Sequence, residues 1–132
     1  RSYVPASSFI DFGAGKWQPI EKPGRALSTL RRVASGRAAF GDRFLMPYYG
    51  GGSGLTGRSL SRPVGTITTR DRWGVVDGSR TRMLSKDECR AAMGFPANYI
   101  LPEKHTEAVH MLGNAVSPPM MRDVLLAMQA AA

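Results

Sequence analysis

Helix start and stop signals in residues 85–119 restrict the fold more tightly than any other feature of the sequence. Ser85, with Glu88 three residues later, forms the pattern of a capping box, in which the two side chains satisfy the first backbone N–H groups of a helix. The helix predicted over 86–93 would end at Gly94, because glycine readily adopts the left-handed conformation that closes a helix.

Two further helices are predicted after this one. The first covers 103–112 and would end at Gly113. The second would begin at Ser117, since serine is a favoured N-cap residue and the prolines at 118 and 119 fit a first helical turn. Its apolar face is expected to lie against a core and contains Val124, Leu125 and Met128.

Apolar and β-branched residues upstream predict short strands. The predicted strands are 43–49, 64–69 and 73–77, with residues 70–72 as a hairpin tip and Asp77-Gly78 as a further turn. Pro47 favours a strand at the edge of a sheet, because proline has no N–H to donate. The expected fold class is α+β, a small twisted antiparallel sheet packed with the C-terminal helices.

The first 36 residues are broken by prolines and glycines and predict an irregular segment. One short helix is expected there, capped by Ser28 and stopped at Gly36. Residues 50–57 predict a glycine-rich loop between Arg43 and Arg58, which could settle into a groove of nucleic acid.

Positive charge is concentrated in the middle of the chain. The net charge is +8, from 18 basic residues against 10 acidic ones, and residues 25–82 hold eleven arginines against three aspartates. Guanidinium groups suit bidentate contacts with phosphate and guanine, and a clustered positive field attracts polyanions. A solvated basic surface is the alternative.

The sequence contains no strong candidate for a nucleophile or for a metal site. Cys89 is the one cysteine and lies within the predicted helix 86–93, where a packed core thiol is the favoured interpretation. His105 and His110 are five residues apart, on different faces of a helix, so no metal site is expected. No run of 18 apolar residues is present, so no membrane span is expected, and the cytoplasm is the default location.

The turn Gly113-Asn114-Ala115-Val116 is more specific. An asparagine amide there offers a donor and an acceptor to a polar ligand, although Asn114 could equally satisfy its own turn.

Two stretches together resemble the C-terminal signature of cytosine-5 DNA methyltransferases. RMLSKDECRAAMGFPANYI, from Arg82, matches the family's Arg-x-Leu-Ser-x-x-Glu-Cys helix and Gly-Phe-Pro turn, and Gly113 to Val116 matches its Gly-Asn-Ala-Val block. The order and spacing agree across about 45 residues. PYYGGGSGLTGRSLSRPVGTITTRDRWGVVDG resembles the preceding target-recognition region, and the whole resemblance extends from about Arg37 to Met128.

The resemblance implies S-adenosylmethionine as cofactor and double-stranded DNA as partner. Cofactor contacts would come from Asn114, Ala115 and Val116. DNA contacts would come from Arg58, Arg62, Thr66, Thr68, Arg70, Arg72 and Arg80. Arg82 is a weaker candidate, because its place in the motif suggests a structural ion pair. In the family the reaction begins with addition of a cysteine thiolate to C6 of a flipped cytosine.

The family's Pro-Cys, Phe-x-Gly-x-Gly, Glu-Asn-Val and Gln-x-Arg-x-Arg blocks are absent from these residues. The resemblance therefore implies a recognition portion, inactive alone and without a catalytic residue of its own, in three parts. Residues 1–36 form the irregular segment, 37–82 the DNA target-recognition region, and 83–132 the helical segment that packs on a missing N-terminal catalytic half. A further expectation is that the last helix either folds back on residues 1–40 or packs against a second copy, which would make a homodimer. Two other interpretations are a stand-alone, non-enzymatic DNA-binding module and a basic RNA-associated domain whose likeness is accidental.

Overall fold

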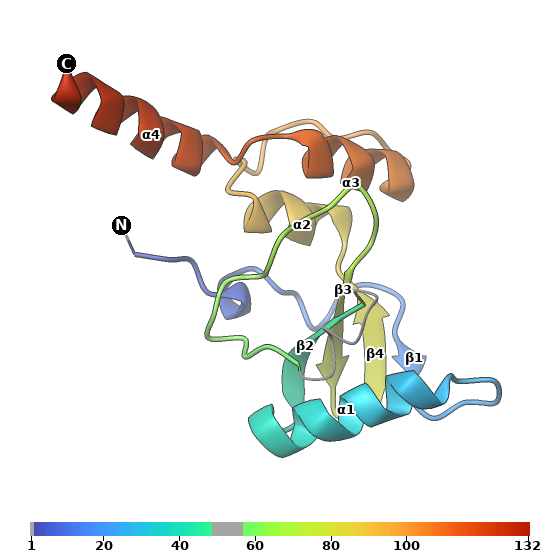
Figure 1. Ribbon diagram of the computed structural model, residues 1–132. Helices are drawn as coiled ribbons and strands as arrows, with labels where there is room; N and C mark the ends of the chain where they lie inside the picture. The colour runs from blue at the N-terminus through green and yellow to red at the C-terminus, as the bar shows by residue number, and fades with distance from the viewer. Residues whose placement is uncertain (1, 49–56) are drawn as a thin grey trace.

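The computed structural model describes residues 2–48 and 57–132, so most of the predicted loop 50–57 lies outside the described residues. Figure 1 shows a sheet flanked by helices, with strand order β1-β4-β3-β2 and antiparallel pairing throughout. The expected α+β class is confirmed. The described elements are a 3-10 helix η1 (Ala6–Ser8), β1 (Gln18–Pro19), α1 (Leu27–Phe40), β2 (Arg43–Pro47), β3 (Trp73–Asp77), β4 (Arg80–Met83), α2 (Lys86–Ala92), α3 (His105–Asn114) and α4 (Pro118–Ala131).

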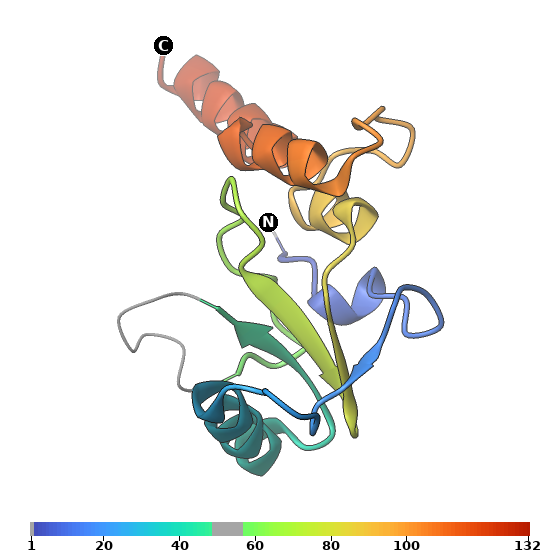
Figure 2. The same cartoon turned by 90° about the vertical axis from the view of Figure 1, so that its right-hand side faces the viewer.

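The sheet separates two apolar cores, because neighbouring residues of a strand point to opposite faces. In β2, Phe44 and Met46 face α1 and pack with Val76. On the other face, Leu45 packs with Val75, and this core continues to α2, α3 and η1. Figure 2 shows α1 on one side of the strands, with α2 and α3 near their far end.

The predicted hairpin was placed wrongly. Residues 64–69 form no strand, so 70–72 is not a hairpin tip. Val64 and Ile67 pack their side chains on the core instead of pairing in the sheet. The actual hairpin joins β3 to β4 through Gly78, whose φ of 60° confirms the turn predicted at Asp77-Gly78.

The helix α1 extends beyond its predicted end. Its N-cap is Ala26 rather than Ser28, and it continues past Gly36 to Phe40. Gly36 lies inside the helix, where the Phe44 ring occupies the space that a Cβ atom would need. Glycine therefore permits close packing here and does not mark a helix end.

The capping box at Ser85 is confirmed. The Ser85 hydroxyl accepts from the Glu88 N–H at 3.1 Å, and Glu88 Oε1 accepts from the Ser85 N–H at 2.8 Å. Gly94, with φ 78°, follows the end of α2 as predicted. The next helix differs from its prediction: α3 runs through Gly113 to Asn114, so Gly113 is a helical residue and not a left-handed stop.

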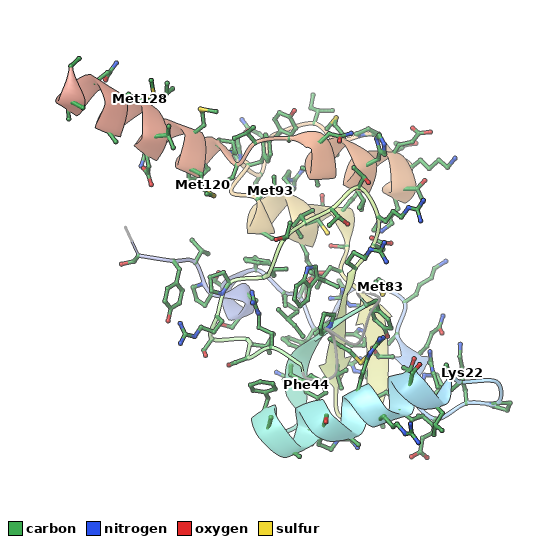
Figure 3. The ribbon with its side chains drawn as sticks, viewed as in Figure 1. Lys22, Phe44, Met83, Met93, Met120 and Met128 are labelled. Carbon is green, nitrogen blue, oxygen red and sulfur yellow. The ribbon has the colours of Figure 1, made fainter. Side chains whose placement is uncertain are left out.

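The last helix, α4, projects away from the rest of the molecule (Figure 1). Its base is anchored where Pro119 lies against Gly94, but no residue of α4 is buried. Val124, Leu125 and Met128 are 53%, 51% and 64% exposed, so the prediction that they face a core within this chain is wrong. The fold-back on residues 1–40 is likewise wrong. Met128 lies far along the helix from the sheet (Figure 3).

Both outer strands of the sheet are short or already paired. β1 consists of Gln18 and Pro19 alone. On the outer side of β2, Leu45 donates to the Arg58 carbonyl at 2.9 Å and accepts from the Arg58 N–H at 2.8 Å. None of the described helices is long and apolar enough to cross a membrane.

Replacing Ser85 with alanine should lower the free energy of unfolding by about 1 kcal/mol, because the first turn of α2 loses its hydroxyl acceptor. Urea denaturation monitored by circular dichroism measures this change. Ser85→Thr is the matched control, since threonine keeps the acceptor, and an equal loss in both variants would contradict the capping role.

Candidate nucleic-acid interface

Residues 57–72 form a segment that leads from the outer side of β2 into β3, and we call it the connecting segment. Its apolar side chains, Leu60, Val64 and Ile67, pack on the core. Arg62 and Arg70 are exposed. One side of this segment is therefore fixed on the protein, while the guanidinium groups of Arg62 and Arg70 reach solvent.

Hydrogen bonds hold the segment to the sheet. Trp73 Nε1 donates to the Thr66 carbonyl at 3.0 Å, and Arg72 Nη1 donates to the Tyr48 carbonyl at 3.2 Å. Arg58 Nη1 donates to the Pro63 carbonyl at 3.3 Å, and its guanidinium lies 5.6 Å from the Trp73 ring centre. Arg58 and Arg72 therefore help to fix the shape of the segment.

The helix α3 holds the same segment at two further places. A Cβ atom on Gly113 would lie closer than 3.0 Å to the backbone between Thr68 and Thr69, so only glycine fits there without movement. Eight residues earlier, His105 Nε2 lies 2.8 Å from Asp71 Oδ2. Residues 68–71 therefore lie along α3, from its last turn to its first residue.

The predicted DNA-binding residues are divided by this arrangement. Arg58, Arg62, Thr66 and Arg70 are exposed on the connecting segment. Thr68 is committed to a local turn, because its hydroxyl donates to the Arg70 carbonyl at 3.0 Å. Arg80 lies elsewhere, at the end of the β3–β4 hairpin.

Arg80 belongs to a cluster of cations and aromatic rings. Its Nη2 lies 2.7 Å from Asp77 Oδ2, and Arg43 Nε lies 2.8 Å from Asp77 Oδ1. The Arg80 guanidinium is 4.2 Å from the Trp17 ring centre. Hydrogen bonds from Arg43 and then Arg80 lower the pKa of Asp77 despite an opposing effect of burial. Arg80 is thus partly neutralised.

Arg82 has a structural role, as its motif position suggested. Arg82 Nη1 lies 2.6 Å from Glu88 Oε1, and both side chains are 5% exposed. Burial alone would raise the pKa of Glu88, but hydrogen bonds from Arg82 and from the Ser85 and Asp11 backbone outweigh it, and the pKa is lowered. This pair joins β4 to α2 and to the segment after η1.

Cys89 is a packed core thiol, as predicted. It is 4% exposed. Burial, followed by the negative charges of Asp71 and Glu88, raises its pKa to about 12. A thiol with this pKa is protonated at neutral pH and cannot act as a nucleophile.

The three predicted cofactor residues lie at an open corner between α3 and α4. Asn114 is exposed, with its Nδ2 3.5 Å from His110 Nδ1, and Val116 is 59% exposed. Ala115 is half-buried. Because Gly113 contacts Thr68, this corner lies directly beside the connecting segment.

Sequence reasoning missed the two contacts that join these regions, Gly113 with Thr68 and His105 with Asp71. A glycine between Leu112 and Asn114 was a signal, but it was interpreted as a helix end. The aspartate and histidine are 34 residues apart and gave no signal.

Comparison with known proteins gives two matches and one absence. The family described as C-5 cytosine-specific DNA methylase matches residues 19–130. The type II methyltransferase M.MspI from Moraxella sp is 29% identical over 69 residues, which cover 52% of this chain and 15% of that relative. No solved structure resembles the chain closely enough to count as a match.

Proposed function

Because this chain belongs to the C-5 cytosine-specific DNA methylase family, we propose that it is the portion of a DNA (cytosine-5) methyltransferase that binds double-stranded DNA and selects the target cytosine. The chain spans 15% of the length of the M.MspI relative, so methyl transfer is an activity proposed for a longer protein.

The observation that carries this proposal is the fixed connecting segment with Arg62 and Arg70 directed to solvent. A segment held by the Thr66 carbonyl, by Gly113 and by Asp71 keeps one shape before DNA arrives, which reduces the entropy lost on binding. Exposed arginines contact phosphates or guanine edges. These contacts would offset the few kcal/mol that flipping a base costs.

We place the cysteine nucleophile outside these 132 residues. Cys89 is the one cysteine of the sequence, and it is buried with a pKa raised to about 12. The exposed apolar residues of α4 offer a surface on which a catalytic portion would dock, and these are Met120, Met121, Val124, Leu125, Leu126 and Met128. A second copy of the chain is the competing occupant.

S-adenosylmethionine is the cofactor of the family, and the open corner fits a contributing role. Among the residues that the structure describes, the Asn114 amide contacts His110 alone, at 3.5 Å, so its donor and acceptor remain available. Asn114, Ala115 and Val116 would therefore form one wall of a cofactor pocket whose other walls lie in the catalytic portion. The cofactor supplies the methyl group.

A filter-binding titration with a random-sequence 20-base-pair duplex tests the proposal. The binding constant should fall steeply as salt rises, and Arg70→Gln should reduce the slope of log K against log salt by about one, because one phosphate contact is lost. Arg31→Gln, an exposed arginine on α1, is the matched control and should leave the slope unchanged. Equal slopes in the wild type and Arg70→Gln would contradict the assignment.

The two apolar cores favour one alternative, a DNA-binding module that works alone, because the sheet is packed on both faces without a partner. In that case S-adenosylmethionine and Asn114→Ala should have no effect on duplex binding when a catalytic portion is supplied. Light scattering distinguishes a monomer from a dimer formed through α4.

A further inference from the structure

A groove of about 470 Å³ opens alongside β4 and the residues that directly follow it. Residues from five separate parts of the chain line it, among them Lys16, Gln18, Arg25, Tyr48, Thr81 and His105. A volume of this size is within the range of small-molecule sites.

The groove meets the connecting segment at His105, which lines the groove and lies 2.8 Å from Asp71 of that segment. The groove therefore borders the connecting segment and adds the side chains of Lys16 and Arg25, which lie outside that segment.

The charge of the groove is one-sided. Among the described residues, Lys16 makes no ion pair, and Arg25 directs its donors to the carbonyls of Ile20 and Pro19 at 2.9 and 2.8 Å rather than to a carboxylate. No aspartate or glutamate is found among the residues that line it. Arg82 also lines the groove, but its charge is paired with Glu88, which lies outside the lining.

An aromatic side chain stands beside these cations. Tyr48 is half-buried, and the Arg32 guanidinium lies 5.8 Å from its ring centre. Burial raises the pKa of Tyr48, and the charges of Arg25 and Arg32 oppose that increase, so the phenol is neutral and close to both arginines. A ring next to cations suits a ligand whose base or sugar packs on the ring while its phosphate is attracted by the cations.

We infer that this groove binds a nucleotide unit, with its phosphate between Lys16 and Arg25 and its base or sugar against Tyr48. The phosphate would belong either to the backbone of DNA that extends past the connecting segment or to a free nucleotide. The first source rests on the proposed function, whereas the second is independent of it.

The test compares Lys16→Glu with Arg31→Glu, an equal charge reversal on an exposed α1 residue outside the groove. Backbone amide NMR spectra would be recorded with adenosine monophosphate, adenosine, inorganic phosphate and the 20-base-pair duplex. Lys16 is exposed and has no described side-chain partner, so its replacement should leave the free spectrum otherwise unchanged.

If the source is DNA, the duplex shifts the Gln18 and Thr81 amides, and Lys16→Glu removes those shifts and lowers the salt slope by about one. If the source is a free nucleotide, adenosine monophosphate shifts them and the duplex does not. Three results would overturn the inference. They are amide shifts with adenosine but not with adenosine monophosphate, equal loss of the shifts in the two variants, and no shift of the groove amides with any probe. If the duplex binds without shifting the groove amides, the inference about the groove fails and the proposed function stands. If the nucleotide binds and the duplex does not, the proposed function fails and the inference about the groove stands.

Discussion

Glu88→Ala is expected to lower the free energy of unfolding by about 3–5 kcal/mol, because it leaves the Arg82 guanidinium buried without a counter-charge. Arg82 is 5% exposed on its side chain, so water cannot replace the lost carboxylate without opening the fold. The same change removes the acceptor for the Ser85 and Asp11 N–H groups. Urea denaturation followed by tryptophan fluorescence measures the loss.

A double replacement separates the charge from the hydrogen bonds. Arg82→Met with Glu88→Gln removes both charges while keeping an acceptor for Ser85, so it should be considerably more stable than Glu88→Ala. If the double variant were as unstable as Glu88→Ala, packing rather than the unpaired cation would explain the loss.

Lowering the pH should weaken the Arg82–Glu88 ion pair in the unmodified protein. The pKa of Glu88 is lower in the folded chain than in the unfolded chain. Its stabilisation is therefore complete above the unfolded value and is lost as pH falls through the folded one.

Gly113→Ala is expected to lower the free energy of unfolding by about 1–3 kcal/mol, the usual cost of overpacking. Alanine normally stabilises a helix by about 1 kcal/mol relative to glycine. The sign of the change in unfolding free energy therefore shows whether helix propensity or the steric clash dominates. Here the new methyl would meet backbone atoms of Thr68 and Thr69, which cannot rotate away as the end of a side chain can.

Asn114→Ala is the matched control, since it changes the next residue of α3 at an exposed position. It should leave stability within about 0.5 kcal/mol of the wild type. Gly113→Ala should also weaken duplex binding, because the connecting segment must move. A stabilised Gly113→Ala would show that the segment yields without cost.

Local signals were the most reliable part of the sequence. The capping box at Ser85, the end of α2 at Gly94 and the turn at Gly78 each depend on neighbouring residues, and all three are confirmed. The pairing of Arg82 with Glu88 also spans six residues and fitted its motif.

Long-range contacts explain the errors. Residues 64–69 have the β-branched composition of a strand, but their side chains pack on a core formed by distant elements. β4 was missed because its residues Arg80, Thr81 and Arg82 are polar and do not resemble a buried strand. In the fold their polar groups are paired, which allows the strand to be buried. The site depends on such contacts too, since the residue that α3 places against Thr68 could be identified only from the fold.

The short outer strands have a consequence for how the protein behaves in concentrated solution. A strand from another molecule would find two residues at β1, one of them a proline without an N–H, and at β2 it would find Leu45 already bonded to Arg58. Growth of fibrils by strand addition is therefore blocked on both sides. Association between copies should instead involve the exposed methionines of α4, and charged replacements there should reduce it.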